Sequence, residues 1–211
     1  MEIPQELAEA ATEFLNNIAF PIEPRRMWPG NIGFEGLRGR IQPACQNQIG
    51  RALCRWGDPG FGDLVRAGKR ETGFFPDRLV DAAVRLIRQQ WIPQPPPAWL
   101  TCVPSRRHPT LVPGFARRMA NALGIPFVEC IDKIRETDPQ KTRQNTYQQV
   151  QNLEGTFRVD HNQVNHAPVL LVDDMVDSKW TMTVLGAKLQ QAGSGPVFPF
   201  ALADSSQDGD D

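Results

Sequence analysis

The sequence of 211 residues lacks several features that would assign a protein class directly. No apolar run reaches 18 residues, so a membrane-spanning helix is not expected. A Walker A phosphate loop is missing, and the length leaves no room for a complete ATP-driven motor. The four cysteines form no CxxC pair, which argues against a zinc site and a disulfide framework. Residues 1–20 hold no lysine or arginine, so we expect no signal peptide and a reducing, cytoplasmic location.

What the sequence does contain is typical of a globular protein whose charges are sorted along the chain. Hydrophobic residues make up 40% and charged residues 22%, with a net charge of −1. Residues 1–24 carry five acids and no base, whereas residues 25–70 carry nine bases and three acids. A basic block that includes Trp28 and Trp56 has the composition of a surface that contacts nucleic-acid phosphates. The alternative is a solvated arginine-rich surface that also makes internal salt bridges.

The chain divides at a proline-rich segment, which we expect to be stiff. Residues 93–98 include Pro93, Pro95, Pro96 and Pro97. Before them, residues 1–92 form an expected helical and basic connector, with helices predicted over 4–19, 50–56 and 77–91 from the spacing of apolar residues. Residues 204–211 form an acidic tail.

Residues 99–203 alternate between predicted strands and helices, which indicates a doubly wound α/β domain with a mainly parallel sheet. Residues 133–154 are polar and rich in glutamine, and we expect a long loop or a partly helical flap there. The other segments are strands over 99–103, 126–131, 156–159, 169–172 and 196–202, and helices over 113–123 and 181–192.

The segment Val169–Thr181 carries the sharpest chemical signal. An apolar strand leads into Asp173 and Asp174, and a short loop with Ser178 and Thr181 precedes a helix. Ligands of open α/β sheets bind at the carboxyl ends of strands, and a helix N-terminus favours a phosphate there. Two carboxylates beside such a loop can hold vicinal hydroxyls or Mg²⁺. The alternative is that the two acids merely cap a turn.

This segment resembles the phosphoribosyl-pyrophosphate (PRPP) loop of type I phosphoribosyltransferases. The resemblance implies a phosphoribosyltransferase-like fold, in which Asp173 and Asp174 bind the ribose hydroxyls and Mg²⁺ accompanies PRPP. The 5′-phosphate then lies at the loop positions Asp177, Ser178, Lys179 and Thr181. The chain departs from the family pattern at Lys179, which stands where the family usually has glycine and is followed by the bulky Trp180. Glycine at this position lets the backbone approach a phosphate closely and adopt a positive φ.

A second match follows the first strand of the expected α/β domain. Thr101–His108 takes the place of the family's pyrophosphate-binding loop, so the resemblance implies that Ser105, Arg106, Arg107 and His108 neutralise a pyrophosphate. The alternative is a basic loop that covers the end of the sheet. Cys102, which precedes this loop, is expected to be a buried strand residue and not a nucleophile.

A longer resemblance covers roughly residues 14–203. It is to the C-terminal region of bacterial RecQ-like ATP-dependent DNA helicases that end in a phosphoribosyltransferase-fold domain, where Lys179 and Trp180 are normal. The segments that carry it are Gly50–Asp58, Val65–Lys69, Val103–Pro113, Pro139–Lys141, Asn145–Leu153, Val172–Ser178 and Gly195–Pro199.

The helicase resemblance implies a module, a fragment or separately encoded, that lies beside the motor or the DNA and supports unwinding and repair without transferase turnover. Single-stranded or forked DNA and the helicase motor domains are the expected partners. The alternatives are an active PRPP-dependent phosphoribosyltransferase and a PRPP or nucleotide sensor. Expected contacts to nucleic acid are Arg25, Arg26, Trp28, Arg38, Arg40, Arg51, Arg55, Trp56 and Lys69.

Overall fold

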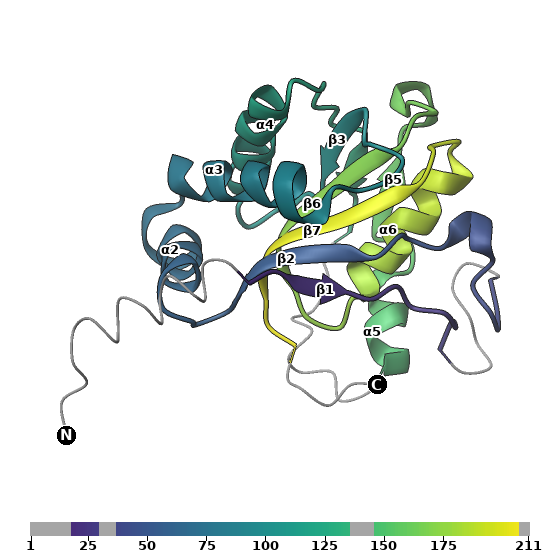
Figure 1. Ribbon diagram of the computed structural model, residues 1–211. Coiled ribbons are helices and arrows are strands. Elements are labelled where there is room, and N and C mark those ends of the chain that lie inside the picture. Colours follow the sequence, from purple (N-terminus) through teal and green to yellow (C-terminus); the bar gives the residue numbers. More distant parts are fainter. Residues whose placement is uncertain (1–17, 30–36, 136–145, 207–211) are drawn as a thin grey trace.

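The computed structural model describes residues 18–29, 37–135 and 146–206. Its main element is a five-stranded sheet in the order β1-β2-β7-β6-β3 (Figure 1). The strands are β1 (Phe20–Ile22), β2 (Gly50–Arg55), β3 (Trp99–Cys102), β6 (Val169–Val176) and β7 (Val197–Asp204). β1 is antiparallel to β2, and the pairs β2–β7, β7–β6 and β6–β3 are parallel. The predicted α/β fold class with a mainly parallel sheet is confirmed.

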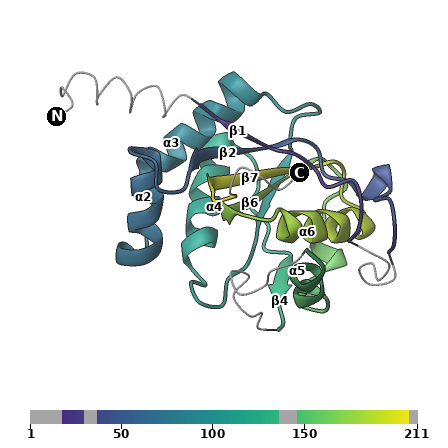
Figure 2. The same ribbon diagram turned by 90° about the horizontal axis from the view of Figure 1, so that it is seen from below.

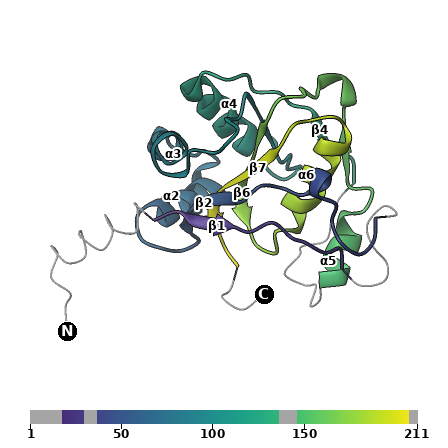
Figure 3. The ribbon, with the colours of Figure 1, turned by 45° about the vertical axis from the view of Figure 1, so that its right-hand side comes forward.

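Helices cover both faces of this sheet. On one face lie α2 (Phe61–Ala67), α3 (Asp77–Arg85) and α4 (Leu111–Leu123), and on the other lies α6 (Trp180–Gln191), as Figures 1 and 3 show. α5 (Thr146–Leu153) packs on the outer side of α6 (Figure 2). The π-helical turns η2 (Gly68–Thr72) and η3 (Leu86–Trp91) extend α2 and α3. The short 3₁₀ turns are η1 (Pro43–Cys45) and η5 (His161–Gln163).

The central strands read as continuous apolar runs because both of their faces are buried. Alternate residues of β6 enter two different cores: Leu170 and Val172 pack toward α3 and α4, and Val169 and Leu171 pack toward α6. α6 is buried on nearly all sides, since it lies between the sheet and the segments around η1 and α5. A helix buried on all sides, such as α6, needs apolar residues around its whole circumference.

Several predicted boundaries need correction. The helix predicted over residues 50–56 is wrong, because Gly50–Arg55 is strand β2 and pairs with β7. The strand predicted over 126–131 is reduced to a single bridge between Phe127 and Leu100. The strand near 156–159 is confirmed as β5 (Phe157–Val159), but it pairs with β4 (Ile131–Lys133) in a separate two-stranded sheet. Residues 4–17 of the predicted helix over 4–19, and residues 136–145 of the predicted flap, lie outside the described residues, and residues 18 and 19 are not helical.

The main sheet draws strands from both sides of the proline-rich segment 93–98. β1 and β2 come from the expected connector, and β3, β6 and β7 come from the expected α/β domain. The two parts therefore share one sheet and its cores, which brings residues of the connector close to the carboxyl end of β6.

Candidate functional site

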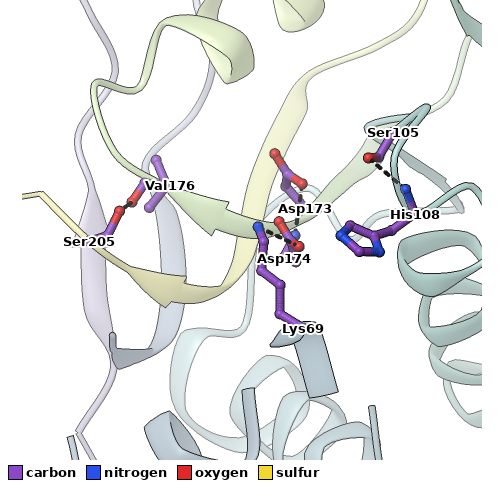
Figure 4. Close-up of polar contacts among 7 residues, drawn as sticks. All are labelled: Lys69, Ser105, His108, Asp173, Asp174, Val176 and Ser205. Carbon is purple, nitrogen blue, oxygen red and sulfur yellow. Dashed lines mark hydrogen bonds and ion pairs between the residues drawn. The ribbon is translucent and has the colours of Figure 1, made fainter. Parts of the chain in front are cut away.

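The acids Asp173 and Asp174 lie inside β6 and not after its end. β7 continues alongside them, with Asp173 opposite Ala201 and Val176 opposite Asp204. On the other side β3 stops earlier, and its last contact is the Val103 N–H donating to the Val172 carbonyl at 2.8 Å. The acids therefore protrude past β3 while their backbone stays paired with β7. We call Asp173, Asp174 and the loop Asp177–Thr181 the acidic edge (Figure 4).

The two carboxyl groups adjoin and share an environment that disfavours two negative charges. Asp173 is partly buried, and its Oδ1 accepts the Asp174 backbone N–H at 2.8 Å. Burial, followed by the neighbouring Asp174 charge, raises the pKa of Asp173 well above its usual range, against an opposing effect of Lys69. A side-chain hydrogen bond with Asp174 also raises this pKa. The environment of the pair therefore disfavours a negative charge on Asp173.

Lys69 supplies the compensating charge at this edge. Its Nζ lies 2.7 Å from Asp174 Oδ2, with side-chain exposures of 29% and 13% respectively. Lys69, for which contact with nucleic-acid phosphates stays a prediction, lies on η2 with its ammonium group against Asp174 (Figure 4). Nothing in the local sequence around Lys69 indicates this pairing, because the two residues are 105 positions apart and meet only through the fold.

The loop after β6 turns sharply into α6. Lys179, the last residue before the helix, adopts a left-handed backbone with φ 65°. Its carbonyl accepts the Thr183 N–H at 3.0 Å, the first hydrogen bond of the helix, and the Thr183 hydroxyl at 2.9 Å. The backbone conformation that glycine favours is thus present here with a lysine side chain. Ser178 is buried, Asp177 is exposed, and Thr181 stands half-buried in the first turn of α6.

Residues of the basic block hold this loop from outside. The Arg25 guanidinium donates to the Ser178 carbonyl at 2.9 Å and 3.3 Å and lies 5.0 Å from the Trp180 ring centroid. Trp28 stacks on Trp180, with ring centroids 6.2 Å apart, and both are almost fully buried. Within the described residues, the Trp180 Nε1 is buried without a hydrogen-bond partner. Arg25 and the two tryptophans therefore restrain the loop that precedes α6.

The prediction that Trp28 stacks on nucleic-acid bases is wrong. Residues 26–28 pair with residues 39–41, through Trp28 N–H to the Gly39 carbonyl at 2.8 Å and Ile41 N–H to the Arg26 carbonyl at 2.9 Å. We call residues 26–28 and 38–41 the basic ribbon. Its inward side chains, Trp28 and Ile41, are buried, and its outward side chains are exposed. The exposed basic residues of the ribbon are Arg26, Arg38 and Arg40.

The remaining predicted nucleic-acid contacts are spread around β2. Arg51 is half-buried and donates to the Gly50 carbonyl at 2.9 Å. The Arg55 guanidinium packs 5.1 Å from the Phe20 ring centroid, and Trp56 is half-buried under Arg70 at 5.3 Å. Lys69, the last of the predicted contacts, pairs with Asp174 at the acidic edge.

The predicted pyrophosphate loop leaves the sheet next to Asp173, because Val103 is bonded to Val172. Ser105 Oγ accepts the His108 N–H at 3.3 Å, which closes a turn at the same end of the sheet as the acid pair (Figure 4). Arg106, Arg107 and His108 are exposed. Their role in binding pyrophosphate stays a prediction. Cys102, just before the loop, is buried, and burial raises the pKa of its thiol, which disfavours a thiolate nucleophile.

A metal ion meets a limited donor set at the acidic edge. Within the described ranges, no group of three or more His, Cys, Asp and Glu side chains could hold a metal ion. Asp173 and Asp174 could serve Mg²⁺ only together with waters and ligand oxygens, and Asp174 is already paired with an ammonium group. No helix among the described residues is long and apolar enough to cross a membrane.

Comparisons with known proteins give weak structural overlays only. No family model and no curated protein matches the sequence. Adenine phosphoribosyltransferase from Leishmania donovani is 15% identical, with 93% of this chain and 69% of that chain covered and a TM-score of 0.44. The Saccharomyces cerevisiae enzyme, complexed with an imino-altritol bisphosphate and adenine, is 16% identical, with coverages of 93% and 89% and a TM-score of 0.40. Overlays at this level do not assign the chain to a family.

Proposed function

We propose that this chain binds a phosphorylated pentose, PRPP or ribose 5-phosphate, at the acidic edge. The observation that carries the proposal is the run from β6 through a left-handed Lys179 into the first turn of α6. Backbone N–H groups at the start of α6 suit a 5′-phosphate. The carboxyl groups of Asp173 and Asp174, just upstream, suit the vicinal ribose hydroxyls.

The left-handed Lys179 supports this assignment further. A residue with a side chain has to be held in this conformation by its surroundings, because it costs about 1–2 kcal/mol relative to the right-handed region. Arg25 binds the Ser178 carbonyl, and Thr183 binds the Lys179 carbonyl, so the surroundings do hold it. Strained backbone that the fold maintains is concentrated at functional sites. The left-handed backbone at Lys179, where the PRPP-loop pattern has glycine, supports the proposed phosphate site.

Calorimetric titration of the full chain with PRPP and with ribose 5-phosphate, in the presence of Mg²⁺, tests the proposal. Replacing both acids, Asp173→Asn with Asp174→Asn, is expected to weaken binding at least about tenfold, because neutral amides hold hydroxyl groups less strongly. The matched control is Asp63→Asn, which removes an exposed carboxylate paired with Arg66 at 2.8 Å. Absence of heat and of a thermal shift with both ligands would rule the function out.

Turnover is a separate property of the same site. Release of pyrophosphate from PRPP in the presence of each common nucleobase separates a binding module or sensor from a phosphoribosyltransferase. We propose binding without turnover, following the helicase-like sequence pattern at Lys179 and Trp180. Steady release with any nucleobase would establish the transferase alternative instead.

A second candidate function is favoured by the basic ribbon. We propose that the chain is a RecQ-like helicase module whose ribbon faces DNA or the motor, because Arg26, Arg38 and Arg40 are all exposed. Three exposed guanidinium groups on one short antiparallel pair suit a phosphate backbone. Fluorescence anisotropy with labelled single-stranded and forked DNA at low salt measures this directly.

The triple variant Arg26→Ala, Arg38→Ala, Arg40→Ala should weaken binding and reduce the slope of log K against log salt by about 2, for about three phosphate contacts on a single strand. A matched triple variant, Arg66→Ala, Arg117→Ala, Arg158→Ala, removes the same charge from exposed surface ion pairs. Equal losses in the two triple variants would mean that net charge, and not the ribbon, determines binding.

A further inference from the structure

We infer that Lys69 takes the place of a divalent cation at the acidic edge, so that a phosphorylated pentose binds there without Mg²⁺. This inference rests on the proposed function. The type I resemblance leads one to expect Mg²⁺ beside Asp173 and Asp174. The structure instead places an ammonium group on Asp174, with Lys69 Nζ 2.7 Å from Oδ2.

The ammonium group and Mg²⁺ would compete for the same oxygen. Mg²⁺ binds carboxylate oxygens at about 2.0–2.1 Å and demands octahedral geometry with several further oxygens. Asp174 retains only 13% of its side-chain exposure, and Lys69 covers the contacted oxygen at hydrogen-bond distance. A divalent ion could reach this oxygen only by displacing Lys69, whose positive charge would otherwise repel it. The donor set therefore does not fit Mg²⁺ while Lys69 is in place.

The backbone of Lys69 is held in place by the packing of the residues that precede it. It follows Gly68, whose backbone is pressed so closely on Phe75 that an added Cβ would lie 2.6 Å from the Phe75 ring. Val65, one turn earlier, is fully buried, and α2 packs on β2 and β7. Because the turn η2 is fixed on the core, the lysine stem leaves it in the direction of Asp174 (Figure 4). Side-chain exposure of 29% is low for a lysine and agrees with this position.

The chemistry expected of the cation is within the reach of an ammonium group. In a complex with a phosphorylated pentose, the cation offsets negative charge between the carboxylates and the ligand oxygens. An ammonium group has three N–H donors, so Lys69 can hold Asp174 and a ligand oxygen at the same time. It carries one positive charge and does not require the octahedral set of oxygen ligands that Mg²⁺ requires. Lys69 would thus be a ligand-binding residue contributed by the N-terminal part of the chain.

Calorimetric titration with ribose 5-phosphate, in EDTA and in Mg²⁺, tests the inference on the full chain. The wild type is expected to bind equally well, within about twofold, under both conditions. Lys69→Met keeps the side-chain length and removes the charge; it should bind at least about tenfold more weakly in EDTA and recover in Mg²⁺. Lys69→Arg should behave like the wild type, and Arg66→Met is the matched control on the same helix, since Arg66 pairs with Asp63 away from the edge.

Each other outcome overturns the inference. Wild-type binding that needs Mg²⁺ shows that the metal is required with Lys69 present. Unchanged binding by Lys69→Met in EDTA shows that the ammonium group does not serve the ligand, and a loss that Mg²⁺ does not restore shows that Lys69 does not stand in for a cation. If no pentose binds the wild type under any condition, the proposed function fails. A direct MgCl₂ titration still decides about Lys69, with heat expected for Lys69→Met and not for the wild type.

Discussion

The acidic edge and the basic ribbon both take positive charge from residues 25–70, and they use it in opposite ways. At the acidic edge, Arg25 and Lys69 point inward, one to the Ser178 carbonyl and one to the Asp174 carboxylate. On the ribbon, Arg26 and Arg40 are exposed to solvent. Neighbouring arginines, Arg25 and Arg26, therefore belong to different sites.

This difference shows that a basic stretch of sequence is not a basic surface. Met27 pairs with Arg40 on this ribbon, and both side chains are exposed, whereas the next residues, Trp28 and Ile41, are buried. The inward side supports the loop before α6, and the outward side remains for a partner. Substitutions of buried and of exposed residues test this distinction.

The largest expected effect is at Trp28. Trp28→Ala should lower the free energy of unfolding by about 3–5 kcal/mol, because it removes a buried ring from a stack with Trp180. Urea denaturation measures this, with Trp56→Ala as the half-buried control and a smaller expected loss. A variant as stable as the wild type that loses DNA affinity would instead place Trp28 on the outward side.

A smaller effect is expected where Asn47, just after η1, packs on α6. The Asn47 side chain is buried and donates to the Met182 carbonyl at 2.8 Å, and an added Cβ at Gly186 would overlap its Oδ1. Gly186→Ala should therefore cost about 1–3 kcal/mol. Gly114→Ala in α4 meets no atom within 4 Å and should gain up to about 1 kcal/mol, since alanine favours a helix.

Thermal denaturation of Gly186→Ala and Gly114→Ala tests whether the segment around Asn47 is fixed on α6. Equal stability of Gly186→Ala and the wild type would mean that Asn47 moves aside without loss. The segment around Asn47 would then pack only loosely on α6 and would not stabilise the acidic edge.

The sequence predicted the α/β core well and the connector poorly, for a physical reason. The apolar run at Val169–Val172 and the helix that ends before Gly124 carry strong local signals, and both are confirmed, with Gly124 at φ 75°. Gly50–Arg55 has apolar residues that fit either period. Its pairing with β7, contributed by residues about 150 positions later, determines that it is a strand.

The candidate site could be predicted only as far as one continuous segment carries it. Asp173, Asp174 and the loop to Thr181 follow one another along the chain, so their meeting at one edge was predictable. Their compensating partner Lys69 and the loop support from Arg25 depend on how β2 and α2 return to the sheet. The residues next to a lysine or arginine in the sequence do not show whether its charge is solvated or paired with a distant residue. The contacts of Lys69 and Arg25 could therefore not be identified from the local sequence.

Asp173 gives a pH-dependent prediction at the acidic edge. Because the folded protein raises the pKa of Asp173 by burial and by the Asp174 charge, the folded state binds a proton more tightly than the unfolded state. Stability contributed by this group is complete below the unfolded pKa and is lost as the pH rises through the folded pKa. Asp173→Asn, which can still accept the Asp174 N–H, should therefore raise Tm by a few degrees at pH 8, and this gain should vanish toward pH 4.

The control for this pH series is Asp63→Asn at the exposed pair on α2. It should show no gain at pH 8 that disappears on acidification. A pH-independent difference between Asp173→Asn and the wild type would mean that packing, and not ionisation, separates the two proteins.

The smallest expected effect is at Lys179. Lys179→Gly relieves a left-handed backbone that costs about 1–2 kcal/mol, but glycine loses more chain entropy on folding, so the net gain should be at most about 1 kcal/mol. Ile92→Gly, at φ 47° and far from the acidic edge, is the matched control and should gain a similar amount. Ribose 5-phosphate affinity separates the two variants. If the Lys179 side chain assists phosphate binding, Lys179→Gly binds the ligand more weakly although the variant is more stable. The affinity of Ile92→Gly should be unchanged. Unchanged affinity in both variants would reduce Lys179 to a backbone position, and the charge at this edge would then come from Lys69 and Arg25.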